Sequence, residues 1–163
     1  LVKYALATPD PEYIDQHNLT SAYNGPLPTF AVVRNPYDRH LSWYKFCLRR
    51  VKELGERSFS FQEFTDGLPK VKEMFTKRGL YWGQPQTDWF TDKKPTYTLK
   101  YENLEQDFII VQHKHSCYKP LLRLNISEEH SAKYNERIAE QVYNLYKPDF
   151  EMFEYNGNSY GDY

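Results

Sequence analysis

The sequence contains few cysteines and no long hydrophobic run. Cys47 and Cys117 are its only two cysteines, and neither has a histidine at metal-ligand spacing. This excludes a disulfide-rich scaffold and a zinc site of the usual kind. One bridge between the two thiols remains open, but two reduced, buried thiols are the favoured interpretation. The longest apolar runs, 30–33 and 108–111, are too short to cross a bilayer, and the residues show no secretory signal.

An excess of charge of either sign is also lacking. Lys and Arg number 21 and Asp and Glu number 22, which gives a net charge of −1. A general binder of nucleic acids or membrane surfaces usually carries a basic excess over the whole molecule, so these classes are disfavoured. Apolar residues make up 40% of the chain and aromatic residues 17%, enough for a substantial core. The length of 163 residues favours a single domain spanning 1–163.

What the sequence does contain is an alternation of strand and helix patterns. An apolar, β-rich run at 29–33 and alternating side chains at 96–101 predict two strands. Apolar stripes at helical spacing predict helices over 41–51, 104–111 and 138–145, the last one stopping near Pro148. Ser60 to Glu63 has capping-box spacing and predicts the start of a short helix. This order indicates an α/β fold with a parallel sheet. We expect the Gly- and Asn-rich segment 156–163 to fray.

The end of the first strand carries the most informative residues. Arg34 follows the strand directly, and ligands of open α/β sheets bind beyond the carboxyl ends of strands. The helix that follows offers backbone N–H groups and a positive dipole end, and Ser42 would add a hydroxyl about one turn into it. Arginine suits forked contacts with phosphate oxygens, so these residues form a plausible phosphate clamp. The alternative is that Arg34 pairs with Asp38 and only ties down the turn.

Five segments in sequence resemble one enzyme family. The sequence VVRNPYDRHLSWYKF, at 32–46, resembles the 3'-phosphate-binding segment of sulfotransferases that use 3'-phosphoadenosine-5'-phosphosulfate (PAPS), and it is closest to their carbohydrate-type branch. Four further stretches resemble family motifs and occur in the family's order: QPQTDWFTD at 84–92, LKYENLEQDF at 99–108, LNIS at 124–127 and YKPDFEMFEY at 146–155. The resemblance covers nearly the whole chain, from about residue 17 to residue 155.

The resemblance implies a fold and a cofactor site. The fold would be that of P-loop-NTPase-like sulfotransferases, with a central parallel sheet flanked by helices. Arg34 and Ser42 would hold the 3'-phosphate of PAPS, and Tyr101 would lie near the adenine. Five further residues would shape the sheet and the pocket: Gln86, Thr87, Tyr97, Glu102 and Asn103. The apolar residues of the closing segment, which are Val142, Leu145, Phe150 and Phe153, are expected in the core.

The implied reaction transfers a sulfuryl group from PAPS to a hydroxyl or amine of a carbohydrate-like acceptor, without a metal. His17, in a stretch that resembles a family motif, is the candidate base, because histidine can accept a proton at neutral pH. A surface or capping role for His17 remains equally open, and Glu12 and Asp15 are the neighbouring alternatives. The remaining histidines are expected at the surface: His40, His113, His115 and His130.

One family element has no counterpart. The Gly-rich loop, approximately PKTGGTS, that cradles the 5'-phosphosulfate is not found, and LVKYAL at 1–6 resembles the helix that normally follows it. We therefore expect the first strand and the phosphate loop to be missing by truncation, rather than absent from a degenerate homologue. A membrane anchor, and with it a Golgi location, would require residues upstream of Leu1. The sequons at Asn18 and Asn125 do not place the chain in a secretory lumen, so its compartment stays open with a lean to the cytoplasm.

Two other functions compete with the sulfotransferase. The first is an inactive homologue that binds the nucleotide through Arg34 and Ser42. The second is an interaction module that binds a polyanion through the basic helix 39–52, although a solvated helix face is the favoured interpretation of that helix. Its basic residues are Arg39, Lys45, Arg49, Arg50 and Lys52. A P-loop kinase is disfavoured, because the Gly-rich lysine motif is not found.

Overall fold

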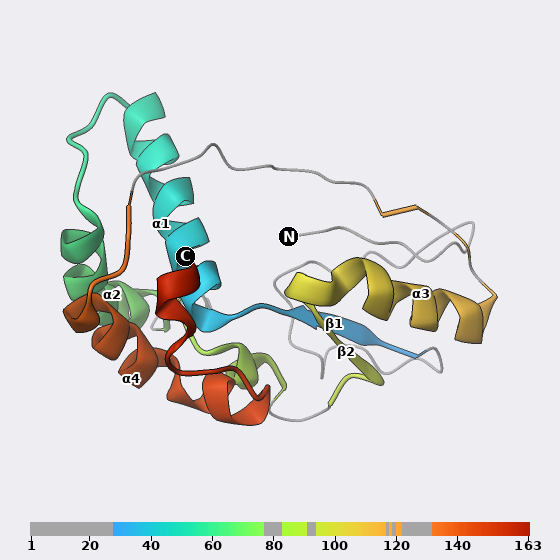
Figure 1. Ribbon diagram of the computed structural model, residues 1–163. Coiled ribbons are helices and arrows are strands. Elements are labelled where there is room, and N and C mark those ends of the chain that lie inside the picture. Colours follow the sequence, from blue (N-terminus) through green and yellow to red (C-terminus); the bar gives the residue numbers. More distant parts are fainter. Residues whose placement is uncertain (1–27, 77–82, 91–93, 117, 119, 122–131) are drawn as a thin grey trace. The chain divides into compact units, whose positions relative to one another are not determined.

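The computed structural model describes residues 28–76, 83–90, 94–116, 118, 120–121 and 132–163 (Figure 1). In chain order the main elements are β1 (Phe30–Val33), α1 (Pro36–Glu53), α2 (Phe61–Thr76), β2 (Tyr97–Lys100), α3 (Leu104–His115) and α4 (Glu136–Met152). Three 3₁₀ helices lie between or after them: η2 (Gln86–Phe90), η3 (Tyr101–Asn103) and η4 (Ser159–Asp162). The chain is therefore a mixed α/β protein, as the sequence predicts.

The chain divides into two compact units, each described here by itself. The sheet unit comprises Leu1–Val33 and Trp89–Ile126, and the helical unit comprises Arg34–Asp88 and Ser127–Tyr163. In the sheet unit, β1 and β2 pair in parallel, with Phe30 opposite Tyr97 and Val33 opposite Lys100. The predicted parallel pairing is confirmed, although β2 ends at Lys100, so Tyr101 lies in η3 rather than in the strand.

A small core joins the sheet to α3. Leu99, Phe108 and Val111 are buried in it, and Phe30 and Val32 pack against them. Side chains two apart on a strand share one face, so Phe30 with Val32 and Tyr97 with Leu99 form a single apolar surface that α3 covers. The apolar residues of α3 that face this surface recur at helical spacing. The helix predicted from that spacing is confirmed.

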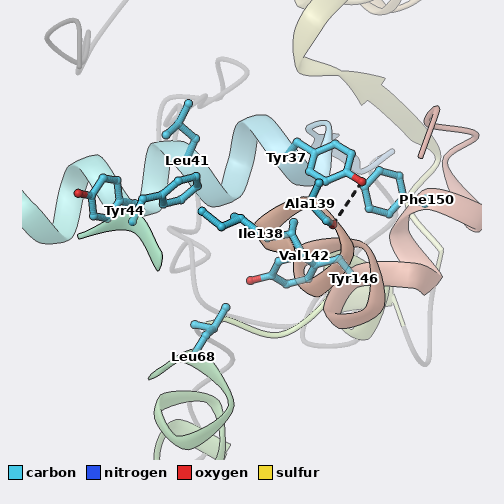
Figure 2. Packing of buried hydrophobic residues seen from close by; sticks show 10 residues of the cluster. Tyr37, Leu41, Tyr44, Leu68, Ile138, Ala139, Val142, Tyr146 and Phe150 are labelled. Atoms are coloured by element: carbon cyan, nitrogen blue, oxygen red, sulfur yellow. Dashed lines mark hydrogen bonds between the residues drawn. The ribbon is translucent and has the colours of Figure 1, made fainter. Parts of the chain in front are cut away.

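The helical unit packs α1 and α2 against α4. Tyr37, Leu41 and Tyr44 of α1 belong to one buried core with Ile138 and Val142 of α4, and Figure 2 draws these side chains. The rings of Tyr37 and Phe150 lie 4.9 Å apart between their centres. Of the closing residues expected in the core, Val142, Phe150 and Phe153 are buried and Leu145 packs against the core while partly exposed. Burial of large aromatic side chains supplies much of the stability of such a core.

Local capping signals position α1 and α2. The side chain of Asn35 accepts a hydrogen bond from the Tyr37 backbone N–H at 2.9 Å, and Pro36 occupies the first helical position, where no N–H is needed. Ser60 and Glu63 form the predicted capping box, since the Ser60 N–H donates to Glu63 at 2.7 Å and the Glu63 N–H donates to the Ser60 hydroxyl at 3.2 Å. The helix that follows has 16 residues, so the expectation of a short helix was wrong.

The closing part of the chain supports one expectation and corrects another. The helix predicted over 138–145 is interrupted at Tyr146, where φ is −120° and ψ is 21°, which agrees with the predicted stop near Pro148, and a second helical segment carries α4 on to Met152. A proline removes one N–H and crowds the preceding turn, so it can bend a helix that packing then continues. Residues 156–163 do not fray, because Gly157 accepts a hydrogen bond from the Tyr37 hydroxyl at 2.6 Å and Ser159 accepts one from the Asn35 side chain at 3.0 Å.

Cys47 is a half-buried free thiol, and burial raises its pKa to about 11. Cys117 lies outside the described residues. Within the described part of the chain, no helix combines the length and the hydropathy that a membrane crossing requires.

Candidate functional site

Arg34 lies directly after β1 and two residues before α1. The side chain of Gln86 forms hydrogen bonds with its backbone. The Arg34 N–H donates to Gln86 Oε1 at 2.9 Å, and Gln86 Nε2 donates to the Arg34 carbonyl at 2.8 Å. The Gln86 amide thus pairs with both backbone groups of Arg34, the N–H and the carbonyl, as a residue of a neighbouring strand would. These bonds fix the direction in which the Arg34 side chain leaves the backbone. The role expected for Gln86, shaping the pocket, stays a prediction.

The guanidinium of Arg34 forms an ion pair with Asp38. Arg34 Nε donates to Asp38 Oδ2, one turn further along, and the two side chains are 27% and 21% exposed. The turn-tying pair that the sequence left open is therefore present. A guanidinium carries five N–H donors, and the ion pair with Asp38 engages the one on Nε. The pair thus orients the guanidinium beside the N-terminus of α1.

Ser42 lies on α1, half-buried. Because α1 begins at Pro36, Ser42 falls about two turns into the helix rather than one. Residues three and four apart share a helix face, which places Asp38, Ser42 and Lys45 on one face of α1. Arg34 and Ser42 both belong to the helical unit. A phosphate bound to Arg34 and Ser42 would be attracted by the positive charge of Lys45 on that face and repelled by the negative charge of Asp38.

Asp149 is the residue that sequence reasoning missed. It lies on α4 with 0% of its surface exposed, and one oxygen, Oδ2, accepts from Gln86 N at 2.8 Å and Gln86 Nε2 at 3.3 Å. The other oxygen, Oδ1, accepts from Thr87 N at 2.9 Å. The motif around 146–155 contains this aspartate, but its spacing gives no sign of a partner 63 residues away.

Arg39 is not part of a free basic face of α1, because its guanidinium is paired inside the helical unit. Its Nη1 lies 3.3 Å from Asp149 Oδ2, its Nη2 donates to the Gln84 carbonyl at 2.6 Å, and its guanidinium lies 5.2 Å from the centre of the Tyr146 ring. On the outer part of α1, Arg49 and Arg50 lie 4.0 and 2.9 Å from the Glu53 carboxylate. These contacts favour the interpretation of a solvated, internally paired helix.

Tyr101 belongs to the sheet unit and is 45% exposed. It follows Lys100, whose partner in the sheet is Val33, the residue before Arg34. The turn after β2 is held by the Lys100 N–H, which donates to Asp107 Oδ2 at 2.8 Å. Tyr101 thus offers an exposed ring directly after the carboxyl end of the strand next to β1.

His17, the candidate base, lies outside the described residues, as do Glu12, Asp15, Asn18, Asn125 and His130. His113 and His115 are exposed, as expected. His40 is not a surface residue, because only 1% of it is exposed. Among the described residues, no group of three or more His, Cys, Asp or Glu side chains could hold a metal ion.

His40 lies between aromatic rings of α2 and α4 and keeps one defined tautomer. Its Nε2 lies 3.0 Å from the Thr65 hydroxyl, which itself donates to the Phe61 carbonyl at 2.9 Å. The hydroxyl proton is thus committed, so the histidine must donate from Nε2. Burial, and secondarily the Arg39 charge, lowers the His40 pKa to about 3. A neutral imidazole in the core explains why a histidine occupies an apolar face.

The comparisons with known proteins add no relative: no family model, no curated protein and no solved structure matches this chain.

Proposed function

We propose that this chain is a PAPS-dependent sulfotransferase domain that transfers a sulfuryl group to a hydroxyl or amine of a carbohydrate-like acceptor. Two things support the proposal. The first is the resemblance of five segments in the family's order. The second, which carries it, is the way that Gln86 pairs with both backbone groups of Arg34 and so aims the guanidinium beside the N-terminus of α1.

The proposed 3'-phosphate clamp consists of Arg34, Ser42 and the first turn of α1. The phosphate would accept charge-assisted hydrogen bonds from the guanidinium and one from the Ser42 hydroxyl, and the positive end of the helix dipole would add to both. Asp38 would keep the guanidinium in place through Nε. Tyr101, in the sheet unit, is the residue that the resemblance assigns to the adenine, and aromatic faces stack well on nucleobases.

In the proposed reaction, the acceptor oxygen or nitrogen attacks the sulfur in line. The bond between the sulfur and the 5'-phosphate oxygen breaks, and adenosine 3',5'-bisphosphate leaves with that electron pair. A base takes the acceptor's proton, and His17 is the candidate for it. Catalysis of this kind depends on positioning and on electrostatic stabilisation, much as phosphoryl transfer does. The clamp on the 3'-phosphate would supply the positioning.

Calorimetric titration with adenosine 3',5'-bisphosphate and with adenosine 5'-monophosphate tests the clamp, because the two nucleotides differ only in the 3'-phosphate. We expect the bisphosphate to bind more tightly. Arg34→Ala should weaken its binding by about 10- to 100-fold and Ser42→Ala by about 3- to 10-fold, with the monophosphate unaffected. Arg50→Ala is the matched control, since Arg50 lies on the same helix and pairs with Glu53 at the surface.

Each alternative function predicts a different result. Equal affinity for the two nucleotides would show that no 3'-phosphate clamp exists. Binding that falls with salt and with Arg50→Ala, but not with Arg34→Ala, would favour a polyanion-binding module. Binding that requires Arg34, without transfer of sulfate from PAPS to any acceptor, would favour an inactive nucleotide-binding homologue.

A further inference from the structure

The carboxylate of Asp149 is the most fully buried charge near Arg34. Four N–H donors from three residues converge on its two oxygens: Gln86 N, Gln86 Nε2, Thr87 N and Arg39 Nη1, at 2.8 to 3.3 Å. Donors from two different parts of the chain, 39 and 86–87, therefore meet on one residue of α4. A buried carboxylate requires such donors, but their identity has a consequence for Arg34.

Two of these four bonds involve Gln86, whose side-chain amide must face one particular way. Its Oε1 has to meet the Arg34 N–H and its Nε2 the Arg34 carbonyl. A carboxylate only accepts hydrogen bonds, so Asp149 can face the NH₂ group of the amide but would repel its oxygen. The reversed amide would also set oxygen against the Arg34 carbonyl. Asp149 thus selects the one orientation of Gln86 that holds the Arg34 backbone.

We propose that Asp149 is a positioning residue of the 3'-phosphate clamp and acts on Arg34 through Gln86. This inference rests on the proposed function, because it assumes that Arg34 binds the 3'-phosphate. The competing interpretation is that Asp149 only ties α4 to α1 through Arg39, which would affect stability and leave phosphate recognition unchanged.

Two near-isosteric variants separate these interpretations. Asp149→Asn replaces one acceptor oxygen with a donor, so an NH₂ group would face an N–H of Gln86 or Thr87. Gln86→Met removes both side-chain bonds to Arg34 but keeps the Gln86 N–H bond and the Arg39 pair on Asp149. Leu68→Ala, in the core of the same unit, is the control for lost stability alone. If Asp149→Asn leaves Arg39 with an uncompensated charge and does not fold, adding Arg39→Met removes that charge.

The first readout is the ratio of the dissociation constants for adenosine 5'-monophosphate and adenosine 3',5'-bisphosphate, measured on folded protein. We expect Asp149→Asn and Gln86→Met each to lower this ratio at least about tenfold, and Leu68→Ala to leave it unchanged. Combining the first two should lower it no further, because both act through the same bonds. A ratio within twofold of wild type in Asp149→Asn or in its Arg39→Met combination, while Arg34→Ala abolishes it, would overturn the inference and leave the proposed function standing.

The second readout needs no nucleotide. Amide hydrogen exchange at Arg34 should accelerate at least about tenfold in both variants, since the N–H loses its acceptor. The Ile138 amide, which donates to Asn135 at 2.8 Å, is the internal reference in Gln86→Met. Unchanged exchange at Arg34 in the Asp149 variant would overturn the link. A wild-type chain that does not distinguish the two nucleotides would overturn the proposed function, and the inference with it.

Discussion

At the scale of single residues, His40 is an ionisable side chain that the helical unit holds without charge. Its ring centre lies 5.4, 5.2 and 6.0 Å from those of Phe61, Phe64 and Tyr146. Among the described residues its Nδ1 has no hydrogen-bond partner, and a proton added there would bring a charge into this aromatic surrounding. Protonation of His40 is therefore coupled to folding of the protein.

The coupling predicts a pH dependence of stability. In the unfolded chain His40 takes up a proton near pH 6.5, but in the folded protein only near pH 3. Between these values the unfolded state binds more protons, so the free energy of unfolding falls as the pH is lowered, by up to about 1.4 kcal/mol for each pH unit. Above pH 6.5 this contribution is constant. Urea denaturation from pH 5 to pH 8 measures the dependence.

Two substitutions assign the effect to His40. His40→Phe keeps an aromatic ring at the site and should flatten the dependence between pH 5 and pH 6.5. His113→Gln removes an exposed histidine and should leave it unchanged. Glu63 and Asp66 are exposed and have lowered pKa values, so their effect falls below this window. An equal slope in wild type and His40→Phe would show that another group is responsible.

The candidate site could be predicted from sequence only where its contacts are local. The position of Arg34 at a strand end, its pairing with Asp38 and the helix carrying Ser42 all depend on residues within one short segment. Gln86 forms hydrogen bonds with Arg34, 52 residues before it in the chain, and with Asp149, 63 residues after it. No periodicity or spacing records such contacts, since only the packing of α4 against α1 creates them.

At the scale of elements, two glycines lie in opposite environments: one has no room for a side chain and the other has. Gly83 has a φ of +77°, and a Cβ there would lie 2.8 Å from the ring of Trp43 on α1. It precedes Gln84, whose carbonyl accepts from Arg39. Gly67 lies inside α2, where a Cβ would meet no atom within 4 Å. The first position requires glycine, whereas the second does not.

These environments predict effects of opposite sign. Gly83→Ala should lower the free energy of unfolding by about 1–3 kcal/mol, because it adds left-handed strain and a clash with Trp43. Gly67→Ala should raise it by about 0.5–1 kcal/mol, since alanine loses less backbone entropy in a helix. Urea denaturation of both variants measures the difference. A loss of stability in Gly67→Ala, or none in Gly83→Ala, would contradict the packing described for these segments.

The helices that carry an amphipathic stripe and a cap could be predicted from sequence, but the residues at which they end could be predicted only in part. Asn35 and the Ser60–Glu63 box act on the next few residues, so the starts of α1 and α2 follow from local sequence. The break of α4 at Tyr146, two residues before Pro148, follows from the proline. The helical segment after the break is held by burial of Asp149 and Phe150, which are 0% and 3% exposed, and sequence alone does not predict that tertiary packing.

At the scale of the whole molecule, the parallel pairing of β1 with β2 joins segments on either side of α1 and α2 in the chain. Such pairing requires a crossover connection, and the alternation of strand and helix patterns predicted it. Composition gave no sign of the closing segment's role. Its Gly and Asn residues suggest a mobile tail, yet in the helical unit 157–163 folds back onto the start of α1.

Removal of this segment tests its contribution to stability. A chain that ends at Asn156 loses the Gly157 carbonyl, which accepts from the buried Tyr37 at 2.6 Å, and the Tyr160 ring, 6.0 Å from that of Tyr37. The Asn35 side chain also loses its bond to Ser159. We expect the free energy of unfolding to fall by about 2 kcal/mol or more, because the buried hydroxyl keeps only its longer bond, to the Ala139 carbonyl at 3.5 Å, and an aromatic contact is lost. Urea denaturation measures the loss.

The control for this truncation is Gly161→Ala in the intact chain, where a Cβ would meet nothing within 4 Å and no loss is expected. Tyr37→Phe isolates the hydroxyl: it should be destabilising in the intact chain and have a smaller effect in the truncated one, because the nearer acceptor, the Gly157 carbonyl, is already gone. If the truncated chain is as stable as the intact one, the segment does not contribute to the fold. If it is less stable and the effects of Tyr37→Phe are equal in both chains, the loss comes from the other contacts of the segment and not from the Tyr37 hydroxyl.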